Sequence, residues 1–235
     1  MKLNRYYILA LTFCLIITEA NYAQTTRRST EGQTLSSRID KVQHNMLLNG
    51  ANLANANGSP FINDEFELVK FKKLGNRVFL ARYNANLGEM QLKRENDTIA
   101  LDNTKNLELT FTQSNKVYKT HSYTNKENVS KCGFLVVLME NDSLALLKEE
   151  LVKFYDIKPP SNSYEKIKPA EFKRLSDVYY YRQGDKVSLL PQKRKDFLKL
   201  FPQHSSELKD YIKENKISFN KDEDLITLFE YINTL

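Results

Sequence analysis

The pattern of apolar residues changes three times along the chain, and each change indicates a different kind of element. Residues 6–17 are almost continuously apolar and follow the two cations Lys2 and Arg5. This run is well short of the roughly 20 apolar residues that a membrane-spanning helix needs. A charged start, a short apolar run and a more polar end are typical of a secretory signal peptide. We therefore predict a leader over residues 1–23, cleaved after Ala23.

Two other interpretations of the leader fit the residues less well. An uncleaved membrane anchor needs a longer apolar run. A lipid anchor on Cys14 needs a small residue before the cysteine, where Phe13 stands. Cleavage removes Cys14 and leaves Cys132 as the remaining thiol, which we expect to pack as a small hydrophobe in a strand. The predicted product is soluble, has no transmembrane segment, and is periplasmic or secreted.

The mature chain begins with a polar stretch and continues with a long region of period-two alternation. Residues 24–60 are rich in Asn, Ser, Thr and Gly and predict a linker. Over residues 61–191, short alternating runs are separated by polar turns, which predicts an antiparallel β meander. Such a sheet must bury one face, so it should form a roll, a barrel or a sandwich. The predicted strands cover residues 66–71, 78–83, 90–93, 98–101, 107–111, 117–123, 132–139, 172–182 and 187–190.

The last part of the chain has a helical period. In residues 192–235, Leu225, Leu228, Phe229 and Ile232 follow the i, i+3, i+4, i+7 spacing of a helix that buries one face. The helices of this region are each too short to be stable alone, so they should pack on the sheet or on each other. The predicted fold class is therefore α+β, a β meander followed by short C-terminal helices. Residues 144–155 fit either a strand or a helix.

Composition limits the chemistry that the chain offers. It has 3 His and 2 Cys, so a disulfide framework and a cysteine-rich zinc module are excluded. His44, His121 and His204 fall in different predicted elements without the spacing of a metal motif. The sequence also lacks the glycine-rich phosphate loop and the Gly-x-Ser-x-Gly motif. We predict no metal and no cofactor.

Three short motifs resemble one known family. They are the block of residues 58–63 with Phe66, the Arg-Tyr-Asn triplet of residues 82–84 followed by Glu89 and Met90, and the basic block of residues 190–195 with Phe201 and residues 211–213. Together they resemble an uncharacterised family of bacterial cell-envelope proteins that carry signal peptides. The resemblance covers residues 58–235, with Gly88 where the family pattern has Asp. It implies a cell-envelope setting and no established activity.

The strand–turn–strand motif contains the first candidate site. In a strand, Arg82 and Asn84 share one face and Tyr83 lies on the other. Arg82 and Glu89 could pair across the hairpin through a charge-assisted hydrogen bond. This group is either a small polar recognition cluster or a structural pair with an Asn turn residue, and the structural interpretation is the commoner one.

The second candidate site is a basic patch. Lys193, Arg194 and Lys195 stand together at a predicted helix start, with Lys199 nearby, and the whole chain carries a formal net charge of +6. Export separates the protein from nucleic acid, so the expected partners are an envelope protein, an anionic glycan or phospholipid headgroups. The alternative is an ordinary solvated helix face.

The functional prediction is a non-enzymatic envelope or secreted module that binds a partner or a polymer through the exposed face of the sheet. The alternative is a carboxylate-based hydrolase acting on an envelope or extracellular polymer. Adjacent carboxylates such as Glu149 and Glu150 face opposite ways in a strand and do not converge from their spacing alone. A third possibility is a surface protein that associates with itself through an unprotected edge strand.

Overall fold

The structure is a computed structural model, and it describes residue 53 and residues 55–75, 77–95, 97–104, 106–162 and 164–235. The predicted leader and most of the predicted linker lie outside the described residues, as does His44. Ala56–Leu235 form one unit. Its first residues already join the strands, because Asn57 bridges to Glu171 and Phe61 bridges to Asn84.

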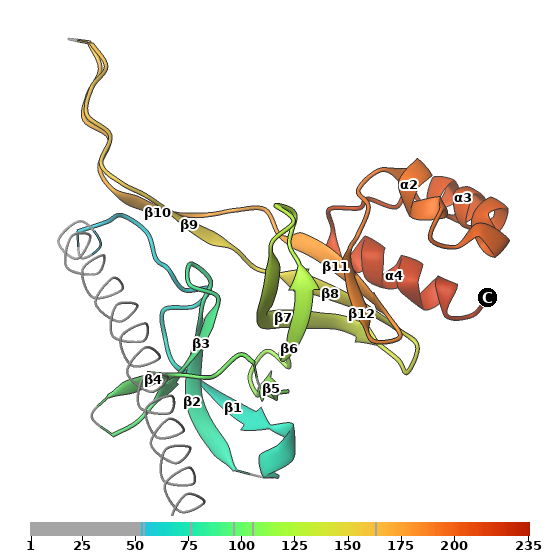
Figure 1. The fold of residues 1–235 in the computed structure, drawn as a ribbon, viewed down its shortest axis with the longest axis horizontal. Coiled ribbons are helices and arrows are strands. Elements are labelled where there is room, and N and C mark those ends of the chain that lie inside the picture. Colours follow the sequence, from blue (N-terminus) through green and yellow to red (C-terminus); the bar gives the residue numbers. More distant parts are fainter. Residues whose placement is uncertain (1–52, 54, 76, 96, 105, 163) are drawn as a thin grey trace, which may run out of the picture. The chain divides into compact units, whose positions relative to one another are not determined.

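Ten strands of the described residues form one sheet (Figure 1) in the order β12-β11-β8-β7-β6-β5-β1-β2-β3-β4. The strands are β1 (Glu67–Phe71), β2 (Val78–Asn84), β3 (Glu89–Lys93), β4 (Thr98–Ala100), β5 (Glu108–Phe111), β6 (Val117–Thr124), β7 (Ser130–Glu140), β8 (Leu144–Glu149), β11 (Val178–Gln183) and β12 (Lys186–Leu189). Neighbours in this order are antiparallel. In addition, β12 meets β6 in parallel at Val187 and Tyr123, so part of the sheet closes on itself like a barrel. The predicted α+β fold with an antiparallel meander is confirmed.

Two segments differ in detail from the sequence prediction. Residues 144–155, which fitted a strand or a helix, form β8 and the strand β9 (Val152–Tyr155). The single strand predicted over residues 172–182 is divided into β10 (Glu171–Arg174) and β11, and β10 pairs with β9 in a separate two-stranded sheet. The register shifts by one residue between the Arg174–Val152 pair and the Val178–Glu149 pair, and between them the backbone N–H of Leu175 and the guanidinium of Arg174 both donate to the carbonyl oxygen of Leu151.

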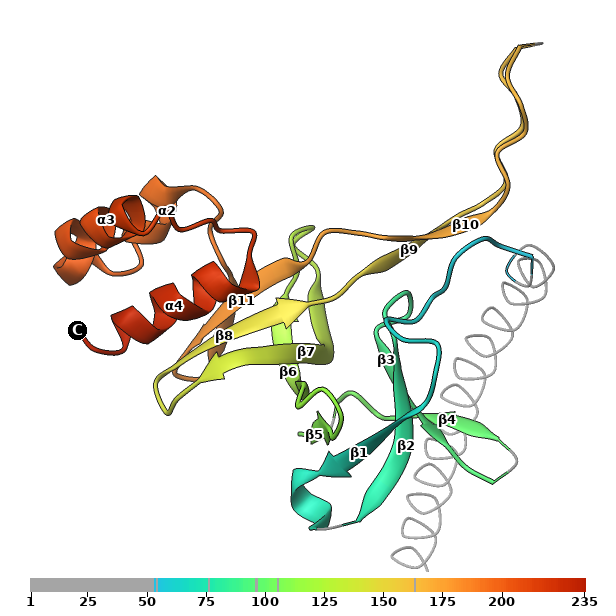
Figure 2. The same cartoon turned by 180° about the vertical axis from the view of Figure 1, so that it is seen from behind.

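The C-terminal helices pack on one end of the sheet. They are α2 (Arg194–Leu198), α3 (Ser205–Glu214) and α4 (Asp222–Ile232), with the 3-10 turn η2 (Pro202–His204) between α2 and α3. Another 3-10 turn, η1 (Lys72–Leu74), follows β1. Leu225, Leu228 and Phe229 of α4 are fully buried against residues of α2, α3 and the strands, among them Leu146. Figures 1 and 2 show α4 beside the strands, and it contacts β7 and β8. The apolar stripe of α4 therefore has the role that its spacing predicts.

Leu228→Ala tests this packing. We expect the free energy of unfolding to fall by about 3 kcal/mol, because truncation removes buried methyl groups and leaves a cavity. Urea denaturation measures the change. Glu230→Ala, on the exposed side of the same helix, is the matched control and should change stability by less than about 0.5 kcal/mol. A similarly small effect of Leu228→Ala would contradict the docking of α4.

Candidate functional site

The hairpin of β2 and β3 holds the first candidate cluster, but its members do not converge. The register places Asn84 opposite Glu89 and Arg82 opposite Gln91. Arg82 donates from Nε to Oε1 of Gln91 at 3.2 Å, and from Nη1 to the carbonyl oxygen of Asp64 at 3.0 Å. The ion pair expected between Arg82 and Glu89 is replaced by these bonds, since the turn brings Gln91 rather than Glu89 to the position opposite Arg82.

Arg82 also stacks on aromatic rings. Its guanidinium lies 3.6 Å from the ring centre of Phe61 and 4.4 Å from that of Phe66. A planar cation against two rings is a stabilising arrangement that fixes the chain entering β1. Oδ1 of Asn84 accepts hydrogen bonds from the backbone N–H groups of Asn86 and Leu87, as a turn residue does. Arg82 and Asn84 thus have structural partners.

Tyr83, the remaining strand member of this cluster, faces a different group of residues. It lines a cavity of about 190 Å³ together with Tyr123, Lys131, Cys132 and Glu149. Cys132 is exposed here, with Sγ 3.2 Å from Oγ of Ser122. The expectation that Cys132 packs as a buried hydrophobe is wrong, because its position on β7 directs it to the surface rather than to the core.

Glu149 is the buried carboxylate of this cavity, and it is only 5% exposed. Its two oxygens accept hydrogen bonds from the hydroxyl groups of Tyr123 and Tyr180, both at 2.8 Å. The two tyrosine rings contact each other edge to face with centres 4.9 Å apart. Lys131 Nζ lies 3.6 Å from the same carboxylate. Burying a charge is costly unless it is hydrogen-bonded and paired, and this cluster supplies both.

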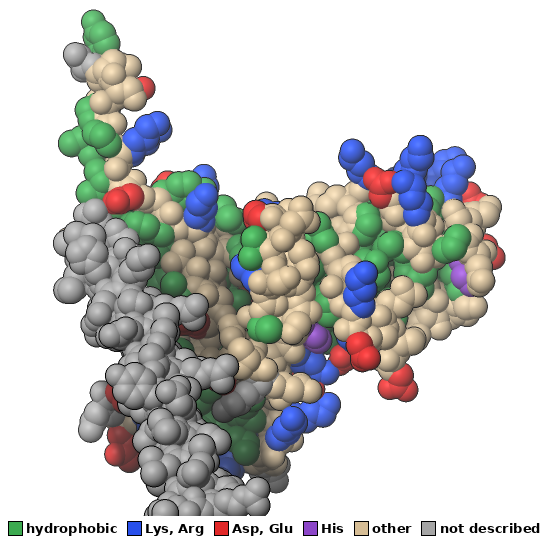
Figure 3. All heavy atoms as spheres, viewed as in Figure 1, with side chains coloured by type: hydrophobic (Ala, Val, Ile, Leu, Met, Phe, Trp, Pro, Cys, Tyr) green, Lys and Arg blue, Asp and Glu red, His purple; other side chains and the backbone are tan. Residues whose placement is uncertain are grey.

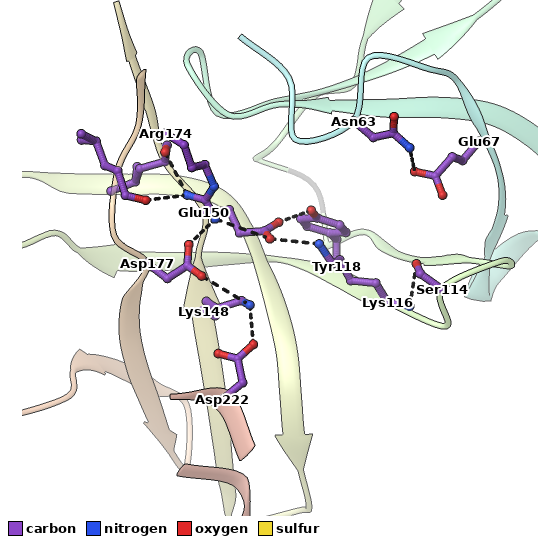
Figure 4. A network of polar contacts seen from close by, with 12 residues as sticks. Asn63, Glu67, Ser114, Lys116, Tyr118, Lys148, Glu150, Arg174, Asp177 and Asp222 are labelled. Atoms are coloured by element: carbon purple, nitrogen blue, oxygen red, sulfur yellow. Dashed lines mark hydrogen bonds and ion pairs between the residues drawn. The ribbon is translucent and has the colours of Figure 1, made fainter. Parts of the chain in front are cut away.

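Glu150 follows directly and has a separate set of partners (Figure 4). It accepts hydrogen bonds from the hydroxyl of Tyr118 and from Lys116 Nζ, the latter at 2.9 Å, and Arg174 lies 3.7 Å away. Glu150 is not among the residues that line the cavity of Glu149. The two carboxylates therefore face different sides, as adjacent residues of an extended chain do.

The tyrosines around these carboxylates act as hydrogen-bond donors. Burial raises the pKa of Tyr83, Tyr118, Tyr123 and Tyr180, and the negative charges of Glu149 or Glu150 raise it further. These phenols stay protonated over the physiological range. The tyrosine hydroxyls consequently stabilise the buried charges of Glu149 and Glu150 by donating hydrogen bonds to them. The cavity beside Glu149 is thus lined by protonated phenols and by a hydrogen-bonded carboxylate.

Lys148, the residue before the pair, extends the polar contacts to the C-terminal helices. Its Nζ lies 2.5 Å from Oδ2 of Asp222 at the start of α4 and 3.5 Å from Asp177 (Figure 4). The hydroxyl of Tyr179 donates to the other oxygen of Asp222 at 2.7 Å. Burial alone would lower the pKa of Lys148, but the hydrogen bond to Asp222 and the nearby carboxylates raise it overall. These contacts tie α4 to β8.

The histidines do not add a metal site to the described part of the chain. His121 lies on β6, where burial lowers its pKa. His204 lies in η2, with Nδ1 3.8 Å from Glu207. Among the residues that the structure describes, no group of three or more metal-ligating side chains comes together.

The basic block of the sequence borders an open groove between α2 and α3. Arg194 and Lys195 line it, and Lys193 precedes them as the N-cap residue of α2. The groove has a volume of about 500 Å³, and its other walls are formed by Leu198, Lys199, Pro202, Ser205 and Lys209. Figure 3 shows basic side chains gathered over these helices. The structure thus places Arg194, Lys195 and Lys199 of the predicted patch around one groove and adds Lys209 to them.

Lys209 lines the groove but was not part of the patch predicted from the sequence. It follows Ser205 by four residues, so both lie on one face of α3. Lys209 is the cation that α3 contributes to the groove, opposite Arg194 and Lys195 of α2. Lys199 bonds to Asp196 at 2.7 Å, and this hydrogen bond lowers the pKa of Asp196. The carboxylate of Asp196 is therefore already bound to Lys199, one of the cations that line the groove.

Compared with protein-family models, with curated proteins and with solved structures, the chain shows no significant match in any of the three. The helices in the described part of the chain are too short or too polar to cross a bilayer.

Proposed function

We propose that the protein is an exported, non-enzymatic binding module that holds an anionic polymer of the cell envelope in the groove between α2 and α3. The observation that carries this proposal is the grouping of Arg194, Lys195, Lys199 and Lys209 around one open groove. Cations on two sides of a groove attract a chain with repeated carboxylate or phosphate groups more strongly than a single charge does.

The lining of the groove fits an anionic glycan. Leu198 and Pro202 also line the groove and offer apolar surface to the C–H faces of a sugar. Ser205 adds a hydroxyl that both donates and accepts hydrogen bonds. The predicted leader over residues 1–23 would deliver the protein to the compartment in which such polymers occur. Mass spectrometry of the mature N-terminus tests this delivery, and we expect Gln24 to be the first residue.

The hydrolase alternative has weaker support. A carboxylate hydrolase needs two carboxyl groups that flank one scissile bond. Glu149 lines the small cavity, whereas Glu150 bonds to Tyr118 and Lys116 away from it. Self-association through the sheet edge also has weak support, because the terminal strand β4 has only three residues.

Charge reversal in the groove tests the proposed function. We expect Lys195→Glu/Lys209→Glu to weaken binding of polygalacturonate, a polycarboxylate probe, by about tenfold or more at low ionic strength, because attraction becomes repulsion. Isothermal titration calorimetry or fluorescence anisotropy measures the affinity. Polyphosphate, used in parallel, shows whether phosphate or carboxylate is preferred.

The matched control carries the same change of net charge elsewhere. Lys70→Glu/Lys126→Glu alters two exposed lysines outside the groove, and we expect it to change the affinity by no more than about threefold. Equal losses in both variants would show that only the net charge matters. Unchanged binding by the groove variant would overturn the proposal.

A further inference from the structure

The strands β9 and β10 begin a long hairpin that we name the arm, residues 152–174. Their register runs from Val152 opposite Arg174 to Tyr155 opposite Glu171. The same register continues to a bridge between Lys158 and Lys168, whose backbones exchange hydrogen bonds of 3.0 and 3.1 Å. Figure 1 shows the two chains running side by side beyond the ends of the strands. The two chains therefore keep one register from the base of the arm to this bridge.

This register assigns the residues of the arm to two faces. Successive residues of paired strands alternate between faces, and the paired numbers add to an even sum, so odd-numbered residues share one face and even-numbered residues the other. The odd face carries apolar residues along its outer part, namely Tyr155, Ile157, Pro159, Ile167 and Pro169. The even face carries Lys158, Lys166 and Lys168 there.

The contacts at the base of the arm agree with this assignment. On the even face Phe154 and Phe172 have ring centres 5.1 Å apart, and Val152 is buried in the core. On the odd face Lys153 lies over the ring of Tyr155 at 5.3 Å. The even face is thus the one that packs on the core at its base, and the odd face is left without such packing.

The outer part of the arm exposes its apolar side chains. Ile157 is 47% exposed, Ile167 is 65% exposed, and Tyr164 near the turn is 98% exposed. Figure 3 shows hydrophobic side chains along the arm with basic ones beside them. Several exposed apolar residues in one place indicate a surface that another molecule covers.

Proline limits how that molecule can bind. Pro159, Pro160 and Pro169 have no backbone N–H, so three positions of the outer arm cannot donate to an added strand. A second copy of the chain, or a peptide, that extends the arm by strand pairing is therefore disfavoured. The side chains of the odd face remain as the binding surface.

We propose that the arm lies in the interfacial region of an anionic lipid bilayer. In this arrangement the odd face contacts the acyl chains, and the lysines of the even face reach the lipid phosphates. The charge of the arm supports this occupant, because residues 157–169 contain three lysines and one acidic residue, Glu165. Each lysine near an anionic surface strengthens binding about fivefold. This inference does not depend on the groove of the proposed function.

The chain has no tryptophan, which allows a direct test. We expect the emission of an Ile167→Trp variant, at a 65% exposed position of the odd face, to shift to the blue when vesicles of phosphatidylglycerol and phosphatidylcholine are added, since the indole enters the interface. Val129→Trp places the same reporter at another exposed apolar position and should give no shift. An unchanged spectrum of the Ile167→Trp variant would overturn the proposal, and a protein partner would then be the occupant to seek.

Vesicle sedimentation separates the two faces. Ile157→Ser/Ile167→Ser and Lys166→Glu/Lys168→Glu should each lower the partition coefficient onto phosphatidylglycerol vesicles by about tenfold or more. Binding to phosphatidylcholine vesicles alone should be weak. The matched control Leu74→Ser/Val129→Ser changes two exposed apolar residues elsewhere and should bind within about twofold of the unaltered protein. All variants have the same N-terminal residues, so any contribution of these residues to vesicle binding is the same in each variant.

The outcomes distinguish the arm from the groove. Lys195→Glu/Lys209→Glu should leave the blue shift of the Ile167→Trp reporter in place, even where polygalacturonate binding is lost. A groove variant that abolishes the shift, or an apolar-face variant that sediments like the unaltered protein, would overturn the assignment of the membrane contact to the arm. Far-UV circular dichroism confirms that each variant is folded.

Discussion

Raising the pH above about 10 should unfold the protein steeply, because buried tyrosines lose protons only in the unfolded chain. Burial raises the pKa of Tyr83, Tyr118, Tyr123, Tyr179 and Tyr180, with nearby carboxylates adding to the effect. Below about pH 10 both states hold these protons and the stabilisation is fully present. Above it the unfolded chain ionises first, and each tyrosine lowers the free energy of unfolding by about 1.4 kcal/mol per pH unit.

Five such groups together correspond to about 7 kcal/mol per pH unit, which is comparable with the whole stability of a typical domain. Urea denaturation at a series of pH values between 8 and about 11 measures this slope. Lys148, whose pKa is also raised, acts in the same direction. A free energy of unfolding that stays level to pH 11 would contradict the burial of these phenols.

Substitution assigns the alkaline effect to particular tyrosines. Tyr123→Phe/Tyr180→Phe removes two ionisable groups, so the slope should become shallower by about 3 kcal/mol per pH unit. Tyr164→Phe, at a position that is 98% exposed, is the control and should leave the slope unchanged. If both variants behave alike, the buried cluster is not the source of the pH dependence.

Glu149→Ala should lower the free energy of unfolding by about 3–5 kcal/mol at neutral pH. The substitution removes the acceptor of two buried hydroxyl groups, those of Tyr123 and Tyr180. A buried donor without an acceptor costs about 1–3 kcal/mol, and the lost side chain leaves space beside the existing cavity. Urea denaturation of the variant and of the unaltered protein gives the difference.

Two further variants separate hydrogen bonding from charge. Glu149→Gln retains one acceptor oxygen and should cost about half as much as Glu149→Ala. Glu65→Ala removes an exposed carboxylate and should stay within about 0.5 kcal/mol. Equal stabilities for Glu149→Ala and Glu65→Ala would show that Glu149 is not held by its tyrosines.

Local periodicity predicted the elements of the fold because it depends on near neighbours in the chain. Leu225, Leu228 and Phe229 lie three and four positions apart, so their common helix face follows from helix geometry. Strand alternation likewise predicted most strands of the sheet. It could not resolve residues 144–155, where Lys148, Glu149 and Glu150 interrupt an apolar run and fit an exposed helix face equally well. Charges within such a run were the available signal for a buried polar cluster.

Such local patterns could not predict which residues contact each other in the candidate sites. Glu149 bonds to Tyr123 and Tyr180, which are 26 and 31 residues away in the sequence. These residues meet because β12 closes onto β6 and because β11, rather than β9, lies beside β8. The same dependence explains the misplaced Arg82–Glu89 pair, since hairpin register decides which residues are opposite each other.

The sequence by itself determined the antiparallel sheet, the C-terminal helices and the basic character of residues 193–195, because period, turns and composition are properties of short segments. Only the tertiary structure decided that Lys209 joins Arg194 and Lys195 around one groove, and that the arm has an apolar and a basic face. The physical reason is that strand order, register and helix packing minimise the free energy of the whole chain. Side chains that are distant in sequence meet only as a result of that global minimum.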